Sequence, residues 1–181
     1  MPLRPGMTAA SWLALAGVAL LVVPVHAEDA TFDTPSKAPV PRWAMLRRNE
    51  VYARNGPSKD NPKVWTYRVA ALPVQIISET RDWRLVCDPD GGVAWVSKTM
   101  LQAPRTVMSP FQVKLNLHSG ADESSPVKAV VRPKVLAQLV KCKKDWCKVS
   151  VDGVSGWAPQ KSLWGTQTTA VCTRPNPFAS N

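Results

Sequence analysis

The sequence has little of what catalysis or metal binding requires. It contains only 2 histidines and 4 cysteines in 181 residues, and no nucleophile–histidine pair stands out. A Gly-rich phosphate loop and a pair of catalytic carboxylates are also missing. We therefore expect no enzyme activity, no metal site and no cofactor.

A hydrophobic run long enough to cross a membrane is lacking as well. The longest apolar run, Trp12 to Val23, has about 12 residues, whereas a transmembrane helix needs about 20. Preceded by Arg4 and followed by small residues at Val25 and Ala27, the run is typical of a secretory signal peptide. We expect cleavage after Ala27, a periplasmic or secreted protein, and no transmembrane anchor.

Negative charge is scarce. The chain has 23 Lys and Arg against 13 Asp and Glu, a net charge of +10. Removal of the leader takes away Arg4 and no acid, so the mature chain keeps +9. A basic exported protein favours anionic envelope surfaces, and export argues against a nucleic-acid partner.

What the sequence does contain is an internal repeat of about 60 residues. This period is too long for a solenoid unit and suits a small independent domain. We therefore expect two copies of one module and a function in binding. The matching segments are 51–57 with 115–121, 82–86 with 145–149, and 92–96 with 154–158.

Both copies read as short strands separated by turns, without a helical period longer than about one turn. Four strands are expected in each copy, and a long polar loop from Asn55 to Trp65 follows the first strand of the first copy. Strands this short and few suit a small bent barrel, so the predicted fold is all-β. The expected strands are 49–54, 74–78, 83–87 and 92–96, then 113–117, 135–141, 146–151 and 154–158.

The domain boundaries follow from the repeat and from the Pro-rich segment that precedes it. Two modules are expected, flanked by a flexible linker and a short tail. The predicted parts are a signal peptide (1–27), a linker (28–41), a first module (42–105), a second module (106–165) and a C-terminal tail (166–181).

The four cysteines are expected to form two disulfides in an oxidising compartment. If a hairpin turns at Lys144-Asp145, Cys142 and Cys147 face each other at a non-hydrogen-bonded position, where α-carbons lie about 4.5 Å apart. The first copy has Glu79 and Arg84 at the same two sites, an opposite-charge pair. Cys87 is then left for Cys172, which ties the tail to the first module. A zinc site has the wrong spacing and only His118 beside the cysteines.

Each copy resembles a bacterial SH3 (SH3b) domain. The family pattern Val-Asn-Val-Arg-Ser-Gly-Pro, then Asp-Trp with a valine three residues on, then Gly-Trp-Val and a closing Leu, occurs twice with substitutions. Residues 41–165 also resemble tandem SH3-like exported proteins of alphaproteobacteria. The matching residues are Val51 to Pro57, Asp82-Trp83 with Val86, Ala94-Trp95-Val96 and Met100-Leu101, then Leu115 to Ala121, Asp145-Trp146 with Val149, Gly156-Trp157-Ala158 and Ser162-Leu163.

The resemblance implies two tandem SH3-like β-barrels and a non-catalytic binding module of the cell envelope. Modules of this kind often target peptidoglycan or its peptide stems, and related wall hydrolases keep their catalytic residues in a separate domain. The alternative is a protein–protein interaction scaffold for a periplasmic partner.

The expected ligand site lies in the first module. Small β-barrels bind through loops, and Tyr52, Trp65 and Trp83 were expected to form one aromatic platform rimmed by Arg54 and Lys59. The second module has a poorer platform at Trp146 and is expected to be mainly structural. Trp95 and Trp157 are expected in the cores, and His118 is expected to have no role in the site.

Overall fold

The computed structural model describes residues 33–109 and 112–172. The predicted signal peptide lies outside the described residues, and so do residues 28–32 of the predicted linker and 173–181 of the tail. Among the residues that are described, no helix is long and apolar enough to cross a membrane. Within the same ranges, no three His, Cys, Asp or Glu side chains are grouped to hold a metal ion.

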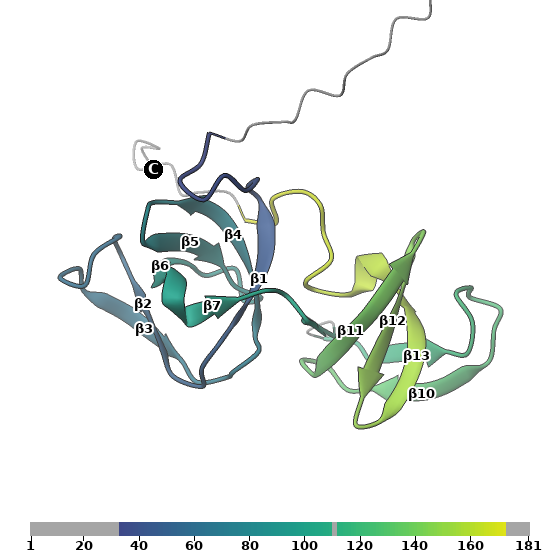
Figure 1. The fold of residues 1–181 in the computed structure, drawn as a ribbon. Helices are drawn as coiled ribbons and strands as arrows, with labels where there is room; N and C mark the ends of the chain where they lie inside the picture. The colour runs from purple at the N-terminus through teal and green to yellow at the C-terminus, as the bar shows by residue number, and fades with distance from the viewer. Residues whose placement is uncertain (1–32, 110–111, 173–181) are drawn as a thin grey trace, which may run out of the picture. The chain divides into compact units, whose positions relative to one another are not determined.

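The first sheet is antiparallel and has the strand order β3-β2-β6-β5-β4-β1-β7 (Figure 1). A single-turn 3-10 helix, η1, separates its last two strands in the sequence. The elements are β1 (Arg42–Leu46), β2 (Val51–Arg54), β3 (Lys63–Tyr67), β4 (Pro73–Glu79), β5 (Trp83–Cys87), β6 (Val93–Ser97), η1 (Lys98–Met100) and β7 (Leu101–Gln102).

The second sheet repeats this order as β10-β9-β13-β12-β11-β8, and a bridge between Met108 and Trp164 stands where β7 pairs with β1. The predicted all-β fold with two tandem modules is confirmed. The elements are β8 (Thr106–Met108), β9 (Leu115–His118), β10 (Val127–Val131), β11 (Leu136–Lys143), β12 (Trp146–Val151), β13 (Val154–Pro159) and the 3-10 helix η2 (Gln160–Ser162).

The polar loop after β2 is shorter than the sequence predicts. It ends at Pro62, and β3 follows with Trp65 paired opposite Ala53. The segment from Lys63 to Tyr67 is rich in β-branched and aromatic residues, which favour a pleated surface with one buried side. Trp65 is therefore a strand residue and not part of a loop.

Each barrel encloses its own hydrophobic core, in which side chains from alternate strand positions point inward. Leu46 and Val86 are fully buried in the first core, and Leu117 and Val149 are fully buried in the second. Burial of a side chain of this size contributes about 1.5–3 kcal/mol each to folding. The two cores therefore supply the rigid frame from which the loops project.

The prediction that Trp95 and Trp157 are core residues is wrong. Both are only half-buried, and neither packs in a core cluster, because Ala94, Val96 and Ala158 take the inward positions. In the second barrel Gly156 is the inward residue before Trp157, at a point where strands β13 and β9 come close. A Cβ atom added to Gly156 would lie 2.6 Å from the Leu117 Cβ, so only glycine fits there.

Both predicted disulfides are present. Cys142 pairs directly with Cys147 across a two-residue turn, with their α-carbons 4.0 Å apart. Lys144 in this turn has a positive φ of 52°, as tight hairpin turns require. In the first barrel Glu79 pairs with Arg84 at the corresponding register, as predicted.

The acid–base pair of the first barrel also anchors the segment before β1. Glu79 has a side chain only 1% exposed and forms ion pairs with Arg84, at 2.9 Å, and with Arg42. Its second oxygen accepts a hydrogen bond from the Ser36 backbone N–H at 2.8 Å. Burial by itself raises the pKa of Glu79, but the hydrogen bonds from Arg42 and Ser36 outweigh it and lower the pKa to about 2.

The chain after η2 runs along the first barrel and is fixed there at several points. The fully buried Gln75 side chain donates to the Thr169 carbonyl at 2.7 Å and accepts from the Val171 N–H at 2.9 Å. The Trp43 indole N–H donates to the Gln167 carbonyl at 2.7 Å. The disulfide from Cys172 to Cys87 completes this attachment.

Candidate functional site

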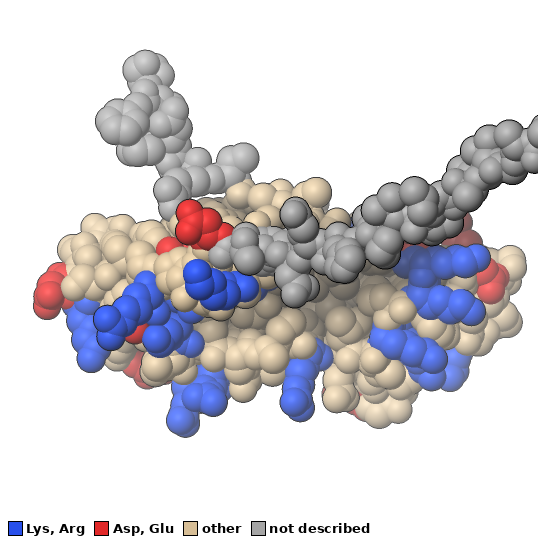
Figure 2. Space-filling model, turned by 45° about the horizontal axis from the view of Figure 1, so that its top comes forward, with Lys and Arg blue, Asp and Glu red and all other residues tan. Residues whose placement is uncertain are grey.

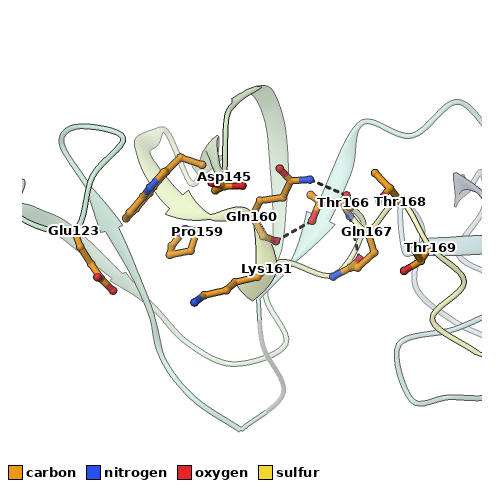
Figure 3. A pocket seen from close by; sticks show the side chains of 10 residues that line it. Glu123, Asp145, Pro159, Gln160, Lys161, Thr166, Gln167, Thr168 and Thr169 are labelled. Atoms are coloured by element: carbon orange, nitrogen blue, oxygen red, sulfur yellow. Dashed lines mark hydrogen bonds between the residues drawn. The ribbon is translucent and has the colours of Figure 1, made fainter.

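A groove of about 530 Å³ opens on the second barrel (Figure 3). Five segments form it: the loop between β9 and β10, the turn before β12 with the first residue of that strand, the end of β13, the 3-10 helix η2, and the attached tail. Its size is typical of a site for a small ligand or a short polymer segment. The lining residues are Glu123, Asp145, Trp146, Pro159, Gln160, Lys161, Thr166, Gln167, Thr168 and Thr169.

Trp146 provides the aromatic surface of the groove. It is half-buried, begins β12 and lies directly opposite Pro159 on β13. The His118 ring packs edge-to-face against the Trp146 ring, with the ring centroids 5.4 Å apart at an interplanar angle of 81°. An indole held in this way is preorganised to pack against a ligand.

His118 positions two parts of the groove at once. The side chain is only 8% exposed, and its Nδ1 lies 2.8 Å from the Ser125 carbonyl oxygen in the β9–β10 loop. The same ring supports Trp146. We did not expect this role from the sequence, where His118 stands beside no other residue of the groove.

The tail wall of the groove is fixed by hydrogen bonds to η2. The Gln160 side chain donates to the Thr166 carbonyl at 3.0 Å, and the Thr166 hydroxyl donates to the Gln160 carbonyl at 2.9 Å. The Gln167 side chain donates to the Leu163 carbonyl at 2.8 Å. Figure 3 shows the first two of these bonds between the helix and the tail.

Three charged side chains line the groove without a partner among the described residues. Glu123, Asp145 and Lys161 are exposed, and their side chains form no hydrogen bond or ion pair with the described part of the chain. Figure 3 places them toward one end of the groove, with Thr168 and Thr169 at the other. Their charged groups are therefore available to a ligand.

The corresponding aspartate of the first barrel is already paired. Asp82 lies at the position of Asp145, because the N–H of Lys98 donates to its carbonyl as that of Gln160 does to the carbonyl of Asp145. The Lys98 ammonium lies 2.9 Å from the Asp82 carboxylate. The hydrogen bond from Lys98 lowers the pKa of Asp82.

The residues expected to form an aromatic platform lie in different surroundings. Tyr52 is 41% exposed, donates to Glu50 at 2.6 Å and carries the Lys63 ammonium 3.5 Å above its ring. Trp65 packs against the first core, on the face of the sheet opposite to Tyr52. The structure therefore does not bring Tyr52 and Trp65 together.

The other two predicted site residues have structural surroundings of their own. Arg54 donates to the Asn61 carbonyl at 2.5 Å and so holds the β2–β3 loop, as His118 holds the β9–β10 loop. Trp83 is half-buried at the start of β5, the position that Trp146 has in β12. A pocket of about 220 Å³ in the first barrel lies beside β1 and β7, and none of the predicted residues lines it.

Most groove residues were missed from the sequence, although one signal was available. Asp145-Trp146 repeats Asp82-Trp83, so the position of the indole could have been found in either copy. The repeat also aligns Lys98 with Gln160, but only the structure shows that Lys98 pairs with the aspartate. The tail wall has no sequence signal, because it has no counterpart in the first copy.

Comparison with known proteins identifies the repeated module. Residues 47–102 and residues 112–165 each match the sequence profile of the bacterial SH3 domain. These two segments together make up more than half of the chain. No curated protein matches the chain at a significant level.

Among solved structures, the chain is similar to two proteins from Trichomonas vaginalis. NlpC2 shares 14% identity and a TM-score of 0.32 over 70% of this chain and 48% of that one. NlpC1 shares 14% identity and a TM-score of 0.30 over 70% of this chain and 46% of that one. The chain thus spans about half the length of these structures, and a likeness of this degree says nothing about function.

Proposed function

We propose that this chain, which belongs to the bacterial SH3 domain family, is a non-catalytic binding module of the cell envelope. Its second barrel would hold a segment of peptidoglycan, most simply a peptide stem, in the groove at Trp146. Bacterial SH3 domains commonly bind cell-wall polymers. The observation that carries the proposal is a groove that combines a supported indole with charged side chains that have no partner among the described residues.

The chemistry of the groove suits a peptide or a sugar chain. The Trp146 indole offers a flat apolar face, and the tail offers the hydroxyls of Thr168 and Thr169. Sites of this kind use an aromatic anchor for affinity and a few polar groups for orientation. The groove has no arrangement of nucleophile and base that would make it catalytic.

The basic surface of the chain supports binding to an anionic wall. Figure 2 shows Lys and Arg side chains spread over the face in view, with fewer Asp and Glu between them. The net charge of +10 agrees with this view. Such a surface raises the concentration of the protein near an anionic polymer without selecting a particular group on it.

Sedimentation with purified peptidoglycan tests the proposal. We expect the protein to cosediment, and binding to persist at about 0.5 M NaCl, because this salt concentration screens general charge attraction. Trp146→Ala should weaken binding by more than about tenfold. The control is Trp83→Ala, the same change at the equivalent site of the first barrel, which should bind like the wild type.

Circular dichroism of both variants establishes that they remain folded. Equal loss in the two variants, or wild-type binding that disappears at 0.5 M NaCl, would contradict the groove as the binding site. Failure to sediment at any salt concentration would favour the alternative of a protein-interaction scaffold.

A further inference from the structure

The charge of the groove is opposite to that of the chain. Two carboxylates, from Glu123 and Asp145, and one ammonium, from Lys161, line it, whereas the chain as a whole carries +10. Unpaired carboxylates are unexpected in a site for a polymer that the protein would attract by positive charge alone. They indicate that some group of the ligand is cationic.

In the first barrel, the carboxylate at the position of Asp145 is paired with a lysine of the chain itself. There Lys98 pairs with Asp82, and Lys59 stands in the β2–β3 loop at the position of Glu123. This correspondence follows from the loop closures, Asn55 with Pro62 and Ser119 with Pro126. In the second barrel Gln160 and Glu123 stand at the positions of the two lysines, and Lys161 stands at the position of Thr99. The cation that pairs with the aspartate in the first barrel is therefore not present at its position in the second.

The indole that lines the groove with the two acids fits the same ligand group. Trp146 follows Asp145 directly and lines the groove with it. A cation over an indole face is attracted by the negative charge of the ring, most strongly for tryptophan. Two carboxylates and an indole that line one groove are thus complementary to the same kind of ligand group, a positively charged nitrogen.

We propose that the groove recognises a free ammonium group of its ligand, held by Asp145 and Glu123 against the face of Trp146. Lys161 takes up a neighbouring carboxylate, so the preferred ligand is a peptide with both an unblocked amine and a carboxylate. This inference rests on the proposed function, since it names the group of a peptide stem that the groove selects. Stems whose amines are consumed in cross-links are then poorer ligands than stems with free amines.

The test compares purified peptidoglycan with the same material after its free amines have been acetylated. Wild-type protein should bind the acetylated polymer about fivefold more weakly. Acetylation makes the polymer more negative, so general attraction to a basic protein would change binding in the opposite direction.

Asp145→Asn is the informative variant, and Asp152→Asn is its matched control. Asp152 lies exposed in the β12–β13 turn, where its φ of 49° suits asparagine equally well. Both changes raise the net charge by one. We expect Asp145→Asn to bind native peptidoglycan about fivefold more weakly and to be insensitive to acetylation, because it removes the same interaction. Asp152→Asn should bind at least as well as the wild type.

Glu123→Gln provides a second test at an exposed loop residue whose side chain has no partner among the described residues. Equal binding of Asp145→Asn, Glu123→Gln and wild type, with no effect of acetylation, would overturn the ammonium proposal. If Trp146→Ala still abolishes binding in that case, the groove remains the binding site. If Trp146→Ala has no effect, the proposed function itself fails.

Discussion

The two barrels share one strand order but stabilise equivalent positions by different chemistry. The hairpin that carries Glu79 and Arg84 in the first barrel carries the Cys142–Cys147 disulfide in the second. The first solution depends on pH and the second on redox state. Because two different side-chain pairs occupy the same register, the fold requires the register of this hairpin and not a particular pair of side chains.

A second difference separates folding from binding. Asp82, which precedes Trp83 in the first barrel, is paired with Lys98. Asp145, which precedes Trp146 in the second barrel, has no partner among the described residues. The backbone around it is the same, since Lys98 and Gln160 both donate their N–H to the aspartate carbonyl. The first barrel has therefore filled the position with its own cation, and we propose that the second leaves it to a ligand.

The largest expected effect comes from removing the tie between tail and first barrel. Replacing Cys87 and Cys172 together with Ser opens a loop of 85 residues, which the chain-entropy account values at roughly 4–5 kcal/mol of unfolding free energy. We expect a loss of that order in denaturant unfolding. Peptidoglycan binding should fall too, because the tail forms one wall of the groove.

The matched control replaces Cys142 and Cys147 together with Ser. The disulfide removed in this variant joins residues only 5 positions apart. The unfolding free energy of the variant should fall by about 2 kcal/mol on the same account. If both double variants lose the same stability, loop length does not explain the difference between the two disulfides.

The acid sensitivity of the first barrel should come next in size. The pKa of Glu79 is lowered to about 2, so its ion pairs stabilise the folded state above about pH 4.5, the pKa of an ordinary Glu. This stability is lost as the pH falls from about 4.5 to about 2, and amounts to roughly 3 kcal/mol at most. Thermal unfolding between pH 7 and pH 2 measures it.

Glu79→Gln isolates this contribution, because it removes the titrating group and leaves the other acids in place. The difference in stability between wild type and Glu79→Gln should shrink toward pH 2. A difference that stays constant with pH would show that the Glu79 carboxylate does not titrate in this range.

The smallest expected effect is on the aspartate of the first barrel. Lys98→Gln copies the second barrel at this position and should raise the pKa of Asp82 toward its ordinary value, since the hydrogen bond from Lys98 is what lowers it. An NMR titration of the Asp82 carboxyl carbon measures this change. If the pKa of Asp82 does not change, the hydrogen bond from Lys98 does not account for the electrostatic difference between the Asp82 and Asp145 positions.

The hairpin disulfide could be predicted from the sequence because local geometry decides it. A two-residue turn at Lys144-Asp145 fixes the register, and the register places Cys142 opposite Cys147. The repeat then gave an independent check through Glu79 and Arg84. Local turns and the internal repeat were thus enough for the all-β class and the two modules, but β1, β3, β7, β8 and β10 lie outside the four strands expected in each copy.

The tryptophans were harder to place, because two rules conflict at them. Large aromatic residues favour burial, but the two-residue period of a strand puts Trp95 on the face opposite to Ala94 and Val96. In the structure the strand period decides the placement, and Trp95 is only half-buried. Trp65 was misplaced for another reason: it looked like a loop residue, and it lies in β3 on the face opposite to Tyr52.

The groove itself was beyond the sequence for a different reason. One wall comes from residues 166–169, which hydrogen bonds to Gln160 and Leu163 hold locally. The same segment is also held on the first barrel by Trp43, by Gln75 and by the disulfide from Cys172 to Cys87. In each contact with the first barrel, the two residues lie between 85 and 124 positions apart in the sequence. No local sequence pattern predicts the contacts of Trp43 and Gln75 with the tail.

The Cys87–Cys172 disulfide also determines how the chain carries tension. The covalent path from residue 33 to residue 172 passes through the disulfide and bypasses residues 88–171. A pull applied at these two points loads the first barrel up to Cys87 and leaves the whole second barrel slack within a closed covalent ring. The second barrel thus lies outside the covalent path that carries the load, whereas Trp43 and Gln75, which hold the tail, lie within it.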